Sequence, residues 1–221
     1  MTAIIFDVES SGLVEPRIVE AAWLRIPDPN TLAPAEQFSR RYNPGKAIEL
    51  GALATHHIMD EDLVDCPPHT DFQLPNGIEY LVGFNIDYDW KVIGQPDVRR
   101  ICVLALSRSF FPLLDTHTQS AMLYHFVRPV ARDLLKDAHS AEQDVSNCLI
   151  VLQHLIKLMV EPGKGITWEE IWNRSEQARI PTVMSFGKHK GTAIKDVPAD
   201  YRRWLLGQAD IDPYLAKALR G

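Results

Sequence analysis

Two carboxylates stand at the end of the first apolar stretch of the chain. Residues 3–6, Ala-Ile-Ile-Phe, are typical of a buried strand, and Asp7 and Glu9 follow them two positions apart. Because alternate residues of a strand point to the same face, both carboxylates should project from one side. Two bare carboxylates at that spacing repel each other, whereas Mg²⁺ or Mn²⁺ between them would be well bound, since these ions prefer hard oxygen ligands. The alternative is that the strand has ended and both groups are solvated.

A second acidic segment follows the apolar residues 80–84. Asn85 can cap the helix expected there, and Asp87 and Asp89 lie near the positive end of that helix. Stabilisation of the helix N-terminus is a good explanation for one of these aspartates but a weaker one for the presence of both.

A third acidic residue interrupts an apolar helix face. Residues 140–160 predict the clearest helix of the chain, because their apolar side chains recur at intervals of three and four. Asp144 lies on that face, where an unpaired buried charge is costly, so we expect it to be paired or bound to metal. His139 stands five residues earlier, about 140° away on a continuous helix, and can share a site with Asp144 only from the turn before the helix.

The elements that must position these residues indicate an α/β domain. A strand meander is followed by alternating helix and strand, a pattern that gives a mixed sheet with helices packed on it. A Pro/Gly-rich break at 161–166 predicts a boundary before a small tail. The expected elements are strands at 1–9, 17–26 and 36–44, a helix at 50–57, strands at 79–84 and beginning in 99–106, and helices at 140–160 and 167–178.

Composition sets limits on the partners. The 221 residues are 46% hydrophobic and carry a formal net charge of -6, so an anionic substrate needs a local basic patch or metal ions. The three cysteines are far apart and form no CxxC pair, which argues against structural zinc and a disulfide framework. No apolar run approaches the roughly 20 residues that span a bilayer, and no signal peptide is visible. We therefore expect a cytoplasmic protein without a membrane partner.

Three segments taken together resemble the motifs of the DEDDh 3′–5′ exonucleases, in the proofreading-exonuclease superfamily. The motifs are Asp7-x-Glu9, Asn85-x-x-Tyr88-Asp89 and His139-x(4)-Asp144, in the family's order and spacing. The resemblance implies a ribonuclease H-like mixed five-stranded sheet flanked by helices over residues 1–160. The resemblance also selects Asp89 over Asp87 as the site residue. We interpret Asp87 as a helix-cap residue.

The resemblance implies roles for further residues. Four carboxylates, Asp7, Glu9, Asp89 and Asp144, would hold two divalent ions, Mg²⁺ or Mn²⁺, and His139 would be the general base. Substrate would be contacted by Ser10, Leu13, His56 and Asn85, with Leu13 as a wedge against the terminal base. Two alternatives are equally open: that Leu13 is simply part of the core, and that His56 is a loop histidine without a role. Ser10 stands where many relatives have Thr, which leaves the substrate preference undecided.

The tail at 167–221 is expected to be a small basic module. Lys188 and Lys190 lie between Gly187 and Gly191, and glycines let a backbone approach a phosphate while lysines attract it. We expect these lysines to contact nucleic acid. For Tyr201 and Trp204 we expect packing in a small core, with stacking of either ring on a base as the alternative. The alternative is a hairpin with a solvated charged tip.

The sequence therefore predicts a metal-dependent 3′–5′ exonuclease acting on DNA and releasing nucleoside 5′-monophosphates. A 3′–5′ exoribonuclease acting on RNA or short oligonucleotides would use the same site. An inactive nuclease-like module that only binds nucleic acid is a third possibility, against which the complete carboxylate set argues. The oligomeric state is not readable from the sequence.

Overall fold

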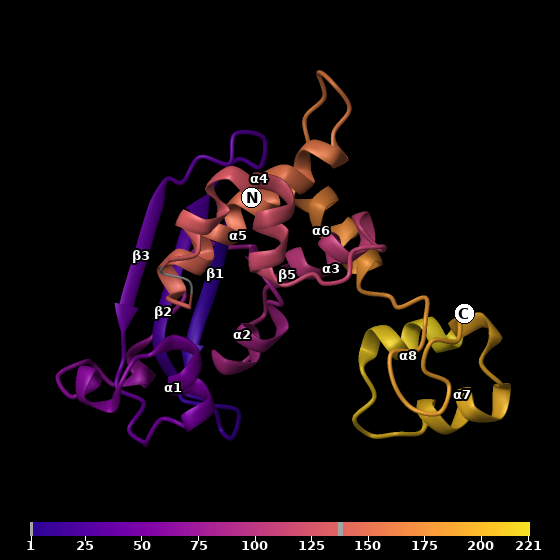
Figure 1. Ribbon diagram of the computed structural model, residues 1–221, viewed down its shortest axis with the longest axis horizontal. Helices are drawn as coiled ribbons and strands as arrows, with labels where there is room; N and C mark the ends of the chain where they lie inside the picture. Colours follow the sequence, from indigo (N-terminus) through magenta and orange to yellow (C-terminus); the bar gives the residue numbers. More distant parts are fainter. Residues whose placement is uncertain (1, 137–138) are drawn as a thin grey trace. The chain divides into compact units, whose positions relative to one another are not determined.

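The structure is a computed structural model that describes residues 2–136 and 139–221 (Figure 1). Its centre is a five-stranded sheet in the order β3-β2-β1-β4-β5. β2 pairs antiparallel with β1 and β3, whereas β4 runs parallel to β1 and to β5. The predicted mixed five-stranded sheet is therefore confirmed. The strands are β1 (Ala3–Ser10), β2 (Ile18–Ile26), β3 (Glu36–Arg41), β4 (Tyr80–Gly83) and β5 (Arg99–Cys102).

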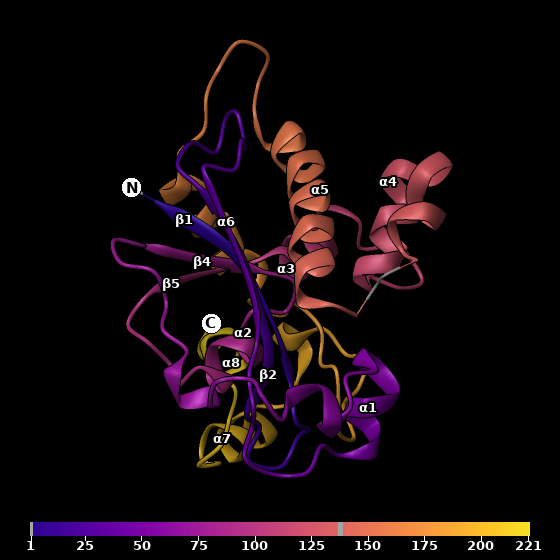
Figure 2. The same ribbon diagram turned by 90° about the vertical axis from the view of Figure 1, so that its left-hand side faces the viewer.

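The sheet is covered by helices that the apolar residues of β1 and β2 require. The side chains of residues 3–6 in β1 are at most 1% exposed, so both faces of this strand are packed. α5 crosses β1 and β2, and α4 packs against α5 (Figure 2). The helices are α1 (Leu50–His56), α2 (Asp87–Val92), α3 (Val103–Phe110), α4 (Gln119–Leu134), α5 (Ala141–Met159), α6 (Trp168–Ala178), α7 (Ala199–Leu206) and α8 (Pro213–Arg220).

Two helices within residues 103–134 differ from the sequence prediction, which also did not include α7 and α8. The strand expected to begin in 99–106 ends at Cys102, where α3 begins at once. The sequence did not predict α4, which carries Pro129 in its interior and a non-helical backbone at Val127. A proline removes one helical hydrogen bond and clashes with the preceding turn, which hides the helical pattern of this segment.

The chain forms two compact units, unit 1 (Met1–Ser175) and unit 2 (Glu176–Gly221). The division lies after the predicted break at 161–166, because α6 is mostly part of unit 1. Trp168 stacks with Tyr80 at 6.5 Å between ring centroids, and the hydroxyl of Ser175 accepts the backbone N–H of Cys102 at 2.8 Å.

Unit 2 has a small core of its own. Its buried residues are Met184, Ile194, Val197, Leu205, Leu215 and Leu219. Across the described parts of both units, none of the helices combines the length and the apolar character needed to cross a membrane.

Candidate active site

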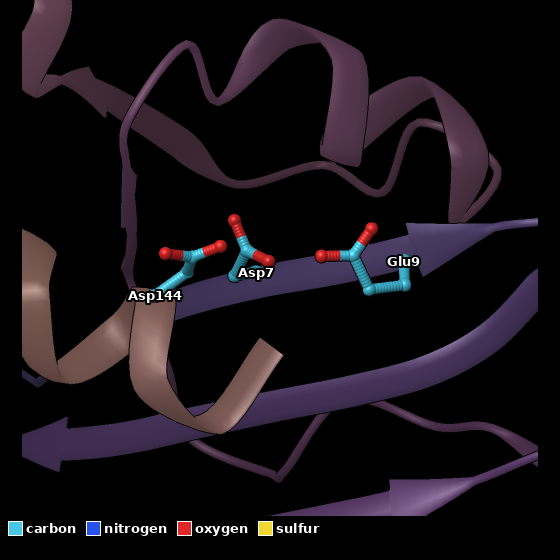
Figure 3. A group of neighbouring side chains, drawn as sticks. All are labelled: Asp7, Glu9 and Asp144. Carbon is cyan, nitrogen blue, oxygen red and sulfur yellow. The ribbon is translucent and has the colours of Figure 1, made fainter. Parts of the chain in front are cut away.

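Three carboxylates from two elements meet over the central strand of the sheet. β1 continues as a strand to Ser10, so Asp7 and Glu9 project from the same face, and the first turn of α5 brings Asp144 beside them (Figure 3). One carboxylate oxygen from each residue lies within 4.8 Å of those of the other two. Such a set of hard oxygen ligands is suited to Mg²⁺ or Mn²⁺.

Burial and mutual repulsion disfavour the charged forms of this carboxylate cluster. Burial, followed by the charges of Asp89 and Glu9, raises the pKa of Asp7 well above its usual value. Burial and the charge of Asp144 raise the pKa of Glu9 from 4.5 to about 8. Without a cation the cluster therefore retains protons at neutral pH, and a divalent ion would compensate the repulsion. The residues present fit a metal centre.

Asp89 lies beside the cluster from α2. Its carboxylate is 5% exposed and accepts the backbone N–H of Val8 in β1 at 3.1 Å. Burial is the main cause that raises the pKa of Asp89 to about 7, with a contribution from Asp144. Asp89 is not one of the three residues whose oxygens lie within 4.8 Å, but its charge reaches Asp7.

The neighbouring Asp87 and Asn85 do not cap α2 as expected. The capping position is Ile86, which has no capping side-chain bond, and Asp87 is the first helical residue. Its carboxylate forms an ion pair with Arg100. Asn85 has a positive φ of 68° and an exposed side chain, so the chain turns sharply here before the helix begins. The preference for Asp89 as the site residue agrees with its burial beside the cluster.

Two side chains that sequence reasoning missed hold the helix carrying Asp144. Glu20 of β2 pairs opposite Glu9, is 7% exposed, and accepts the backbone N–H of Ala141 at 2.8 Å. Gln119 donates to the Asp144 carboxylate at 2.9 Å. The available signal was a glutamate in the middle of the apolar strand 18–26.

His139 lies in the turn that leads into α5, which is the placement that its spacing from Asp144 required. Its φ is 72° and its side chain is exposed, while residues 137–138 before it are outside the described residues. The pKa of Asp144 is raised by burial, an effect that the charge and the backbone N–H of His139 oppose.

A pocket of about 450 Å³ adjoins Glu9. Its lining combines the end of β1, the following loop and α1: Val8, Glu9, Ser10, Gly12, Leu13, Glu49, Gly51, Ala52, Thr55, His56 and Tyr88. The hydroxyl groups of Ser10 and Tyr88 are hydrogen-bonded at 2.6 Å, which ties β1 to α2.

His56 fixes the backbone of the same pocket. Its Nδ1 accepts the N–H of Ile58 at 3.0 Å, so Nε2 carries the proton and donates to the carbonyl oxygen of Ser10 at 3.2 Å. Burial lowers the pKa of His56, which favours this neutral form. The histidine therefore positions Ser10 in addition to lining the pocket.

The loop at the pocket mouth is held by two charged side chains. Glu49 accepts the N–H groups of Leu13 and Val14 at 3.0 and 3.1 Å, and Lys46 donates to the carbonyl oxygen of Val14 at 2.7 Å. Gly12 has a φ of 143°, and a Cβ there would lie 2.1 Å from the Glu49 side chain, so only glycine fits. Leu13 is 80% exposed, and the interpretation of Leu13 as a core residue is therefore wrong.

The remaining two substrate-binding candidates, Lys188 and Lys190, are exposed residues of unit 2. The structure thus brings together Asp7, Glu9, Asp89 and Asp144, with His139 at the edge and Ser10, Leu13 and His56 around the adjoining pocket.

Comparison with known proteins gives one relative along nearly the whole chain. Exodeoxyribonuclease 10 of Escherichia coli K12 is 28% identical over 222 residues, which cover 98% of this chain and 96% of the relative. The same protein from an Escherichia coli O6:H1 strain matches equally. No family model matches the chain.

Solved structures share the fold over three quarters of the chain or slightly more. Exonuclease X in complex with 5′ overhanging duplex DNA aligns with a TM-score of 0.60 and 23% identity, over 78% of this chain and 99% of that one. The nuclease domain of 3′hExo, a DEDDh family member bound to rAMP, aligns with a TM-score of 0.54 and 10% identity, over 75% of this chain and 97% of that one. The predicted ribonuclease H-like fold is confirmed by these structures. The predicted resemblance to exonucleases is confirmed by the relative at 28% identity, which supports an enzyme of the exonuclease class.

Proposed function

We propose that this chain, a relative of exodeoxyribonuclease 10, is a metal-dependent 3′–5′ exonuclease of the cytoplasm that releases nucleoside 5′-monophosphates from DNA. The observation that carries the proposal is the carboxylate cluster. Carboxylate oxygens of Asp7, Glu9 and Asp144 lie within 4.8 Å of one another, and Glu9 also lines the adjoining pocket of about 450 Å³. Bound cations would offset the electrostatic cost of burying these charges together.

The cluster would hold Mg²⁺ or Mn²⁺, two ions in the proposal, through Asp7, Glu9, Asp144 and the adjacent Asp89. Divalent ions supply a more acidic bound water and stabilise negative charge on reacting phosphate oxygens. Gln119 and Glu20 hold α5, and with it Asp144, at the place where the ligands are needed.

The other side chains of the site bind, orient and move protons. His139 takes the proton from the attacking water as general base. The pocket between β1 and α1 receives the terminal nucleotide, with the Ser10 backbone, fixed by His56, beside the sugar. Leu13 at the mouth lies against the terminal base, and the exposed Asn85 contacts the strand.

DNA is the proposed substrate because the relative along the whole chain is an exodeoxyribonuclease. The aligned exonuclease X structure is a complex with duplex DNA, whereas the aligned 3′hExo domain is bound to a ribonucleotide. RNA is therefore included in the test, which also covers the exoribonuclease alternative.

The test is a time course with Mg²⁺ on matched DNA and RNA strands labelled at the 5′ or the 3′ end. A 3′–5′ exonuclease gives a descending ladder from the 5′-labelled strand and immediate release of a mononucleotide from the 3′-labelled one. Undiminished hydrolysis in excess chelator would contradict the metal-dependent mechanism, and a ladder on RNA alone would contradict DNA as the substrate.

Two aspartates of α2 provide a matched pair of variants. Asp89→Asn removes a carboxylate beside the cluster and should abolish hydrolysis, whereas Asp87→Asn removes one that pairs with Arg100 and should retain it. The reverse result would show that Asp87 is the residue of the active site.

A further inference from the structure

Unit 2 differs from the whole chain in charge. It contains eight Lys and Arg residues against five Asp and Glu, whereas the complete chain has a formal net charge of -6. A positively charged unit in an acidic nuclease is complementary to the polyanion that the nuclease must hold.

Unit 2 also exposes aromatic side chains. Trp204 is 56% exposed and Phe186 is 48% exposed, so the expectation that Trp204 packs in the core is wrong. Tyr201 of α7, by contrast, packs against the core cluster of the unit, as expected. Exposed aromatic rings beside basic residues are the combination by which proteins stack unpaired bases.

The lysines of unit 2 lie on a preformed turn. A bridge joins Val183 to Ala193, and the N–H of Gly191 donates to the carbonyl of Met184 at 2.9 Å. At the tip, the N–H of Lys190 donates to the carbonyl of Gly187 at 3.1 Å. Lys188 and Lys190 are therefore presented by an ordered backbone, which lowers the entropy lost when they bind a ligand.

Tyr201 joins this turn to Trp204. A Cβ on Gly187, whose φ is 70°, would lie 2.6 Å from the Tyr201 hydroxyl, so the turn packs closely on this ring. The ammonium of Lys188 is 5.3 Å from the centre of the Tyr201 ring, and the centre of the Trp204 ring lies 5.3 Å from it as well. The charged turn and the exposed indole consequently occupy one neighbourhood.

We propose that unit 2 binds single-stranded nucleic acid by stacking an unpaired base on Trp204, while Lys188 and Lys190 contact the adjoining phosphates. A duplex hides the faces of its bases, so stacking on a side chain selects single strands. The proposal rests on the proposed function in that a single-stranded 3′ end would be the substrate, but unit 2 needs no metal ion for this binding.

The experiment measures binding of a fluorescein-labelled oligothymidylate to the full chain in excess chelator, by fluorescence anisotropy. Trp204→Ala should weaken binding roughly tenfold or more, the usual effect of losing one stacked base, and Trp204→Phe should restore most of it. The affinity for a blunt duplex should be the same for Trp204→Ala and for the unchanged protein.

Lysine variants test the phosphate contacts independently. Lys188→Ala combined with Lys190→Ala should weaken binding and flatten its salt dependence, by about one unit of log-log slope for each phosphate that a lysine no longer neutralises. Lys217→Ala removes a single positive charge from α8 of the same unit and serves as the matched control, with the dissociation constant within about twofold. The lysine pair keeps the proposal testable if Trp204→Ala fails to fold, which circular dichroism would reveal.

Unchanged affinity in folded Trp204→Ala, or equally weakened binding of single strand and duplex, would overturn the stacking proposal. Lys217→Ala should also hydrolyse a dinucleotide at the normal rate in Mg²⁺, because Lys217 lies outside the carboxylate cluster and outside the proposed strand-binding surface. A protein that binds oligothymidylate through Trp204 but hydrolyses no nucleic acid would refute the proposed function and leave this proposal standing. A protein that hydrolyses nucleic acid normally but binds oligothymidylate equally well without Trp204 would refute the strand-binding proposal and leave the proposed function standing.

Discussion

Glu49 holds Leu13 at the mouth of the candidate active site through a hydrogen bond of 3.0 Å from the Leu13 backbone N–H. Its second carboxylate oxygen accepts the N–H of Val14 at 3.1 Å, so one side chain satisfies two neighbouring donors. These hydrogen bonds lower the pKa of Glu49, which keeps the carboxylate ionised at neutral pH. Leu13 is 80% exposed, so hydrogen bonds of the loop backbone, the one to Glu49 among them, must fix its placement.

The first prediction concerns this hydrogen bond. Glu49→Gln leaves one acceptor oxygen for two donors and should loosen the loop without touching the carboxylate cluster. We expect KM for a DNA 3′ end to rise roughly 3- to 10-fold, with kcat on a dinucleotide nearly unchanged, since binding is impaired and chemistry is not.

Glu61→Gln is the matched control, because it makes the same charge change on an exposed residue of the neighbouring 3₁₀ turn. Kinetic constants of Glu49→Gln that equal those of Glu61→Gln would show that the loop needs no carboxylate to position Leu13.

The second prediction concerns the stability of the metal-free cluster. Asp7→Asn removes one of the repelling carboxylates, so in excess chelator this variant should melt a few degrees above the unchanged protein while losing hydrolysis. Thermal unfolding followed by circular dichroism measures this. Addition of Mg²⁺ should raise the melting temperature of the unchanged protein more than that of Asp7→Asn. A lower melting temperature for Asp7→Asn in chelator would contradict the repulsion.

The third prediction follows from the pKa of Glu9, which burial and Asp144 raise from 4.5 to about 8. Between these values the folded protein binds a proton that the unfolded chain has released. The contribution of Glu9 to stability is therefore full below 4.5 and is lost as the pH rises through about 8. In chelator, the melting temperature should fall from about pH 6 to about pH 9 more steeply for the unchanged protein than for Glu9→Gln. Parallel curves would contradict the raised pKa.

The fourth prediction tests the general base. His139→Ala should lower kcat by roughly 10²–10⁴-fold with little change in substrate binding, the usual effect of removing a general base. Asp144 stays in place because Gln119 and α5 hold it, so metal binding should persist. Added imidazole should restore part of the rate, which a structural role of His139 would not explain. A kcat within threefold of normal would exclude His139 as the base.

Local spacing explains why the sequence could predict the cluster. The strand period places Asp7 and Glu9 on one face, the helix period places Asp144 on the buried face of α5, and both were visible within a few residues. Resemblance to known motifs was still required to choose Asp89 over Asp87, because both are compatible with the first turn of a helix.

Hydrogen bonds between distant segments could not be predicted in the same way. Glu20 reaches Ala141 across 121 positions, and Glu49 reaches Leu13 across 36, so no local pattern indicates either pair. The exposure of Trp204 was equally hidden, because an aromatic residue within a short apolar segment has the same pattern whether it faces the core or solvent.

The last prediction concerns where unit 1 ends. A chain cut after Val160 retains every proposed ligand, yet it lacks Trp168 and Ile171, which are 2% and 0% exposed, and the hydroxyl that satisfies the N–H of Cys102. Each large buried side chain contributes about 2–3 kcal/mol, a large share of the stability of a typical domain. Residues 1–160 should therefore be insoluble or melt at a much lower temperature than residues 1–178, which keep α6 whole.

Residues 1–178 should hydrolyse a dinucleotide with kcat within a few-fold of the full chain and show a raised KM for long single strands, since unit 2 is missing. Equal melting temperatures for the two shortened chains would show that α6 belongs functionally to unit 2, and an unchanged KM for residues 1–178 would argue against strand binding by that unit.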